Sequence, residues 1–64
     1  LEMTRKAQQI IDDLFSAYTR DVSLMPTEFA AAAAREDDAG RARVIADYIA
    51  GMTDRYAMKT HAAL

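Results

Sequence analysis

Asp47, Asp54 and His61 are candidate ligands for a divalent cation, because two carboxylates and an imidazole can bind such an ion. They recur at intervals of seven residues, which on one helix separates neighbours by roughly 10 Å along the axis. That distance is too large for one ion to be shared, and helical metal pairs lie three or four residues apart instead. Arg43, one turn before Asp47, is a natural ion-pair partner, and the helix dipole favours a His near a helix C-terminus. We therefore expect a solvated or salt-bridged surface here and no metal site.

No other arrangement of residues in the sequence suggests catalysis. The chain has one His, no Cys and no Gly-rich phosphate-binding loop. Asp54 has no cationic residue three or four positions away, so its carboxylate is either solvated or paired with another segment. We expect no catalytic residue in this chain and no activity from the chain by itself.

The sequence predicts that these residues lie on helices, and the first helix of the chain is predicted over residues 5–20. Its apolar residues recur with the period of a helix, the intervening residues are polar, and Thr4 can cap its N-terminus. The apolar face comprises Ala7, Ile10, Ile11, Leu14, Phe15 and Tyr18.

Two further helices are predicted, over residues 27–35 and 38–62, which makes the fold all-α with three helices. Pro26 disfavours a helical residue before it, and five consecutive alanines favour helix after it. Only Gly51 opposes helix formation in the long third segment, at a cost of about 1 kcal/mol relative to Ala. The candidate caps are Thr27 for the second helix and Asp37 or Asp38 for the third.

The long third helix is expected to bury two of its sides. Its bulky stripe, which should meet the apolar face of the first helix, comprises Ile45, Tyr48, Ile49, Met52 and Tyr56. A stripe of small side chains comprises Ala46, Ala50, Thr53 and Ala57. Gly51 flanks the small stripe, and a glycine inside an Ala-rich helix usually has a packing reason. We therefore expect a neighbouring backbone to approach Gly51 closely, in preference to a solvated glycine.

Size and charge limit the classes of function that the chain can have. Its 64 residues make one helical segment, residues 1–64, with a thin core and no disulfide to reinforce it. A net charge of −2 without a basic cluster argues against nucleic-acid binding. No apolar run approaches the roughly 20 residues of a membrane span, and the absence of Cys and of a signal sequence favours a cytoplasmic location.

One run of residues resembles a known family. The run comprises Asp47, Tyr48, Ile49, Ala50, Gly51, Met52, Thr53, Asp54, Arg55, Tyr56 and Ala57. It resembles the C-terminal signature of the bacterial deoxyguanosinetriphosphate triphosphohydrolase-like family, the dNTP triphosphohydrolases of the HD superfamily. Upstream, the Leu14–Phe15 pair, Tyr18 and the Leu24–Pro26 stretch also resemble the family pattern.

This resemblance implies that the chain is the C-terminal part of a larger, all-helical and homo-oligomeric enzyme. Such enzymes split a dNTP into a deoxynucleoside and triphosphate, using a divalent metal such as Mg²⁺ or Mn²⁺ held by a His, a His-Asp pair and a further Asp. None of those ligands can be placed on this sequence, so the signature residues are expected to be structural. The expected partners are the rest of the parent chain and other copies of it. The alternative is a free-standing helical module for protein–protein interaction.

Overall fold

The computed structural model describes residues 4–64 as four α-helices, α1 (Arg5–Arg20), α2 (Thr27–Ala34), α3 (Asp38–Ala50) and α4 (Asp54–Ala62). A short 3₁₀ turn, η1 (Val22–Leu24), follows α1, and no strand occurs in this part of the chain. The all-α prediction is confirmed, whereas the prediction of three helices is wrong by one. Within the same residues, no helix has the length and apolar character needed to cross a membrane.

The first helix forms where the sequence predicted it. The Thr4 side chain accepts a hydrogen bond from the Ala7 amide at 3.1 Å, which satisfies one of the free N–H groups of the first turn. The helix ends at Arg20 because the next residue, Asp21, is extended and its side chain accepts the Ser23 amide in η1 at 3.1 Å.

The second helix differs slightly from the prediction at both ends. Pro26 and not Thr27 occupies the N-cap position, and its carbonyl accepts hydrogen bonds from the amides of Phe29 and Ala30. No side chain caps this helix, and Arg35 already stands outside it as the C-cap. Proline suits this position because its ring fixes φ before the first turn and it has no amide hydrogen to satisfy.

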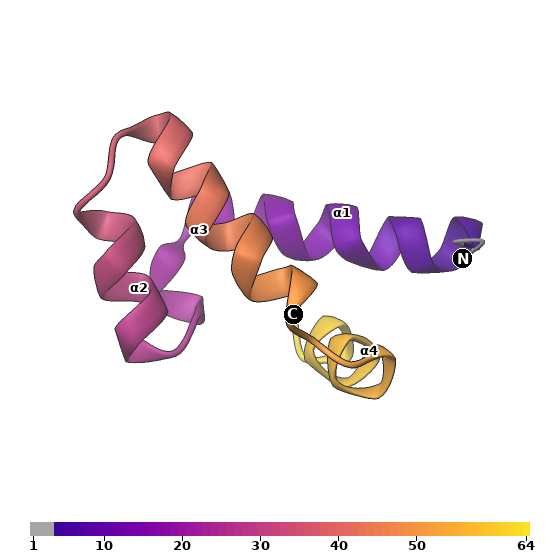
Figure 1. The fold of residues 1–64 in the computed structure, drawn as a ribbon. Coiled ribbons are helices and arrows are strands. Elements are labelled where there is room, and N and C mark those ends of the chain that lie inside the picture. Colours follow the sequence, from indigo (N-terminus) through magenta and orange to yellow (C-terminus); the bar gives the residue numbers. More distant parts are fainter. Residues whose placement is uncertain (1–3) are drawn as a thin grey trace.

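The predicted long helix over 38–62 is divided in two at residues 51–53. The Gly51 amide donates to the carbonyls of Asp47 and Tyr48 at 3.2 and 3.3 Å, and these bonds end α3. Thr53 is extended, and its hydroxyl accepts the Tyr56 amide at 3.1 Å as the N-cap of α4. A cap of this kind replaces part of the lost helical hydrogen bonding, so interrupting the helix here costs little free energy. The chain turns at this corner, and α4 lies against α1 instead of continuing along α3 (Figure 1).

The core lies where α3 crosses the C-terminal half of α1, with α2 packed on the other side of α3 (Figure 1). Ile45 of α3 and Leu14 of α1 are fully buried there, as the predicted meeting of the two apolar faces requires. The buried side chains are Ile10, Leu14, Tyr18, Met25, Ala33, Ile45 and Ile49. Helix α4 contributes none of them, so it is attached to the surface of a three-helix core.

The part of the small-residue stripe that lies on α3 faces solvent, contrary to the expectation of close packing, whereas Ala57 on α4 is half-buried against the core. Ala46, Ala50 and Gly51 are all exposed, and Thr53 is a cap and not a member of a continuous helical stripe. A Cβ atom added to Gly51 would meet only the carbonyl oxygens of Tyr48 and Asp47, at 3.6 and 3.7 Å. These are ordinary van der Waals distances within the local turn, so no neighbouring segment accounts for this glycine.

Candidate functional site

The signature run forms the corner between α3 and α4. Its central residues have local structural tasks, since Gly51 ends one helix and Thr53 caps the next. Met52 lies between them, half-buried against the core, and its amide donates to the Ile49 carbonyl at 3.0 Å. These three residues, Gly51, Met52 and Thr53, form the corner.

Two tyrosines of the run join α3 to α4 across the corner. The hydroxyl groups of Tyr48 and Tyr56 lie 3.3 Å apart, within hydrogen-bonding distance. The Tyr48 ring also packs edge-on against Tyr18 of α1, with ring centroids 5.7 Å apart. It packs in a tilted arrangement against Phe29 of α2, with ring centroids 4.7 Å apart. Burial raises the pKa of Tyr48, and the hydrogen bond with Tyr56 raises it further because that bond favours the neutral phenol. Tyr48 thus stays uncharged and contacts one aromatic side chain from each of three other helices.

Tyr56 departs from the predicted bulky stripe. Its side chain is exposed, because the break at residues 51–53 rotates α4 away from the direction in which α3 would have carried it. The other members of the stripe, Ile45, Tyr48, Ile49 and Met52, are buried or half-buried as expected.

A hydrogen-bonded pair between His61 and Asp13 fastens the far end of α4 to α1. The His61 Nε2 atom lies 2.7 Å from Asp13 Oδ2, and since a carboxylate only accepts, the imidazole donates. The hydrogen bond from His61, with a second from Gln9, lowers the pKa of the Asp13 carboxyl below its ordinary value. The expectation of a solvated or salt-bridged His61 is correct, but the sequence did not identify Asp13, which lies 48 residues away.

The other charged residues proposed from the sequence lie on the surface and are not brought together. Asp47, Asp54 and Arg55 are exposed, and the expected ion pair between Arg43 and Asp47 does not form among residues 4–64. Asp54 is the first residue of α4, where its negative charge meets the positive end of the helix dipole, and this explains an acidic residue without a nearby cation. Within residues 4–64, no group of three His, Cys, Asp or Glu side chains could hold a metal ion.

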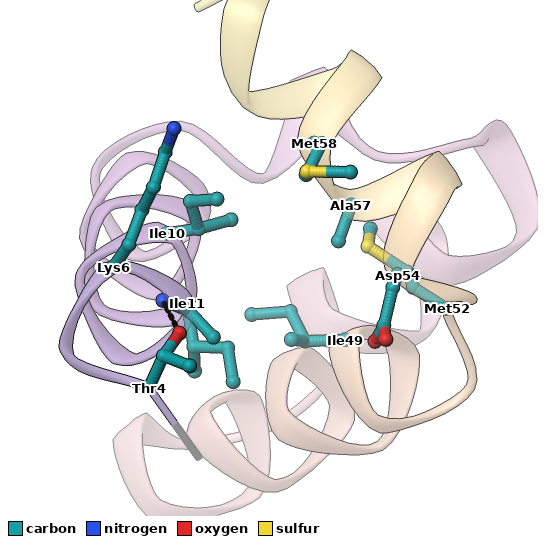
Figure 2. A pocket seen from close by; sticks show the side chains of 10 residues that line it. Thr4, Lys6, Ile10, Ile11, Ile49, Met52, Asp54, Ala57 and Met58 are labelled. Atoms are coloured by element: carbon teal, nitrogen blue, oxygen red, sulfur yellow. Dashed lines mark hydrogen bonds between the residues drawn. The ribbon is translucent and has the colours of Figure 1, made fainter.

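One concavity of the described chain is an apolar groove between the first half of α1 and α4. It has a volume of about 330 Å³, and the end of α3 forms its floor (Figure 2). Aliphatic and Met side chains line it, with Lys6 on the α1 side and Asp54 on the α4 side. The apolar lining comprises Ala7, Ile10, Ile11, Ile49, Met52, Ala57 and Met58. This surface is suited to burying apolar side chains.

Fold and site together describe a small helical segment with a structural corner and an open apolar groove, and comparison with known proteins identifies its family. Residues 1–63 match the family described as "Phosphohydrolase-associated domain". The chain belongs to this family.

Curated relatives carry one shared description. The chain is 55% identical over 64 residues to a deoxyguanosinetriphosphate triphosphohydrolase-like protein of Azoarcus sp. (strain BH72), and 47% identical over 64 residues to one of Bordetella pertussis. It is 44% identical over 59 residues to another of Caulobacter vibrioides. These matches cover 92–100% of the chain but only 15–16% of the relatives' length. No solved structure matches the chain.

Proposed function

We propose that the chain is the C-terminal helical segment of a dNTP triphosphohydrolase of the HD superfamily, and that it serves packing and assembly while the chemistry takes place elsewhere in the protein. The observation that carries this proposal is the match of nearly the whole chain to a phosphohydrolase-associated domain, in relatives about six times as long. The parent reaction would convert a dNTP and water to a deoxynucleoside and triphosphate.

The geometry of the segment supports a structural task. Among the signature residues, Gly51 ends a helix, Thr53 caps the next and Met52 packs against the core. Within residues 4–64, no three carboxylate or imidazole side chains are grouped so that they could bind a metal together. The divalent ion proposed for the parent enzyme, Mg²⁺ or Mn²⁺, would therefore have its ligands outside residues 4–64. It would activate water and neutralise phosphate charge there.

The first test concerns the coding sequence of the full-length protein and its activity. The coding sequence that flanks this segment should encode a His, a His-Asp pair and a further Asp. The full-length protein should release triphosphate from dGTP or another dNTP in the presence of Mg²⁺ or Mn²⁺, and the 64-residue chain should release none above a blank. Turnover by the repurified 64-residue chain would contradict the proposal, as would a flanking sequence without the metal ligands.

A second test separates a packing role from a catalytic one. Thr53→Ala in the full-length protein removes the N-cap of α4 and should lower stability by about 0.5–2 kcal/mol. The kcat of the protein that remains folded should be unchanged. Thr27→Ala is the matched control, because Thr27 also begins a helix and is exposed but its side chain caps nothing. A loss of kcat without a loss of stability in Thr53→Ala would assign this corner to the active site.

A further inference from the structure

Arg41 of α3 is half-buried, whereas every other Lys and Arg side chain among residues 4–64 is exposed. Its Nε atom is buried and has no hydrogen-bond partner in this part of the chain. The salt bridge formed there joins His61 to Asp13, so the guanidinium also lacks a counter-ion within the described residues. Removing a charge from water costs free energy that only a partner offsets. The half-buried, unpaired guanidinium therefore indicates a partner outside residues 4–64.

Arg41 lines a hollow of about 340 Å³ between the C-terminal half of α1 and the start of α3. The lining comprises Phe15, Thr19, Asp38, Arg41, Ala42 and Ile45. The Thr19 hydroxyl already donates to the Phe15 carbonyl at 2.7 Å. The side-chain donors left for a bound group are therefore those of the guanidinium, which has five N–H groups and accepts no hydrogen bond.

The chemistry of this hollow fits a carboxylate carried on a side chain. Burial without a partner affects Nε and not the two Nη atoms of Arg41, which can donate in parallel to two oxygens of a planar group. Asp38 lines the same hollow, and its charge repels a phosphoryl group, with about two negative charges, more than a carboxylate with one. The apolar walls around Ile45 suit the methylene groups that carry a carboxylate in Asp or Glu.

From this arrangement we propose that the α1–α3 hollow receives an Asp or Glu side chain of the longer protein, from outside this chain, and that Arg41 is its counter-ion. The chain spans only 15–16% of the length of its curated relatives, so the greater part of such a protein is available to supply the carboxylate. This inference rests on the packing role proposed above and names the contact that fastens the segment to the remainder.

A series of charge variants in the full-length protein tests the proposal by thermal unfolding. Arg41→Met should lower the Tm by roughly 2–6 °C, because the partner carboxylate loses its counter-ion. Arg41→Lys should lower it less and Arg41→Glu more, since the effect follows the charge at this position. The same changes at Arg43 are the matched control, because Arg43 is exposed on the same helix and does not line the hollow. A Tm that does not follow the charge at Arg41, or follows it equally at Arg43, would overturn the proposal.

The 64-residue chain should respond to Arg41→Met in the opposite sense. Here the carboxylate is missing, and the change replaces an unpaired half-buried charge by an apolar side chain of similar length beside Phe15 and Ile45. Its Tm should stay the same or rise. A fall as large as in the full-length protein would overturn the proposal by assigning Arg41 a role within the segment, and a fall that grows with chain concentration would assign the carboxylate to a second copy. If circular dichroism shows this chain to be unfolded, the charge series in the full-length protein decides alone.

A free anion is the remaining competitor for the hollow. Titration calorimetry of the full-length protein with inorganic phosphate at millimolar concentration should show no binding that Arg41→Met removes, and such binding would overturn the proposal. The Tm series needs no turnover. A flat series with triphosphate release intact would therefore overturn this inference alone, whereas a full-length protein that releases no triphosphate would contradict the proposed function and leave the series readable.

Discussion

Gly51 provides the sharpest test of the corner between α3 and α4, because the sequence and the structure predict opposite results for its replacement. A close-packed glycine should tolerate no larger residue, and overpacking by Leu would then cost about 1–3 kcal/mol. In the structure Gly51 is exposed and has φ −82° and ψ −5°, a right-handed helical conformation that any L residue adopts. We therefore expect Gly51→Ala to stabilise the chain.

The size of the stabilisation expected for Gly51→Ala follows from the backbone freedom of the unfolded chain. Alanine restricts the unfolded backbone more than glycine does, and where the native conformation suits it the gain is about 0.4–1 kcal/mol. The nearest atoms to the new Cβ would be carbonyl oxygens at 3.6 and 3.7 Å, so no steric term opposes the gain. For a domain of this length, the gain corresponds to a rise in Tm of about 2–8 °C.

The measurement is thermal unfolding by circular dichroism at a fixed chain concentration. Gly40→Ala is the matched control at the chain's other glycine, where an added Cβ would lie 2.6 Å from Glu36 Oε1 and 2.7 Å from Glu36 Cβ. That clash should offset the gain in helix propensity, so Gly40→Ala should raise the Tm less than Gly51→Ala. A lower Tm for Gly51→Ala would refute the reasoning and show that another segment covers the corner.

Two further predictions concern the contacts that hold α4. Asp13→Asn should lower the unfolding midpoint near neutral pH, and because the pKa of Asp13 is lowered in the folded chain, the difference from wild type should close as the pH falls below 3.8 through that lowered pKa. In a His61→Ala background the difference should shrink, and an unchanged difference would contradict the pairing. Tyr48→Phe should cost no more than about 1.5 kcal/mol in urea unfolding, because it removes the hydroxyl pair with Tyr56 at the rim but keeps the ring contacts. A larger loss would mean that the hydroxyl has a buried partner.

Much of the fold could be predicted from local sequence, because helix boundaries depend on neighbours a few residues away. Thr4 and Asp37 cap α1 and α3 through hydrogen bonds to amides three residues on, at 3.1 and 2.9 Å. The apolar period of residues 5–20 was sufficient to identify the buried face of α1, on which Leu14 is fully buried. The signature run was likewise sufficient to suggest the description that the curated relatives carry, and the chain belongs to the phosphohydrolase-associated domain family.

The candidate site was harder to predict, because its contacts join segments that are distant in the sequence. Nothing in the sequence pairs His61 with Asp13, since both residues are polar and ordinary on their own helices. The groove beside Lys6 and Asp54 exists only because two helices from opposite ends of the chain lie together. Spacing arguments excluded a shared metal on one straight helix, and they could not foresee that the helix would turn.

From local sequence patterns it follows that the chain is helical, where most helices begin and which faces are apolar. The division of residues 38–62 into two helices instead of one depends on tertiary contacts. The local energies of the two alternatives are close, because Gly51 disfavours helix by about 1 kcal/mol and Thr53 can cap a new one for a similar gain. Contacts made elsewhere therefore favour two helices over one. Ala57 and Met52 pack on the core, and His61 donates a hydrogen bond to Asp13. Those contacts form only when α4 turns back against α1.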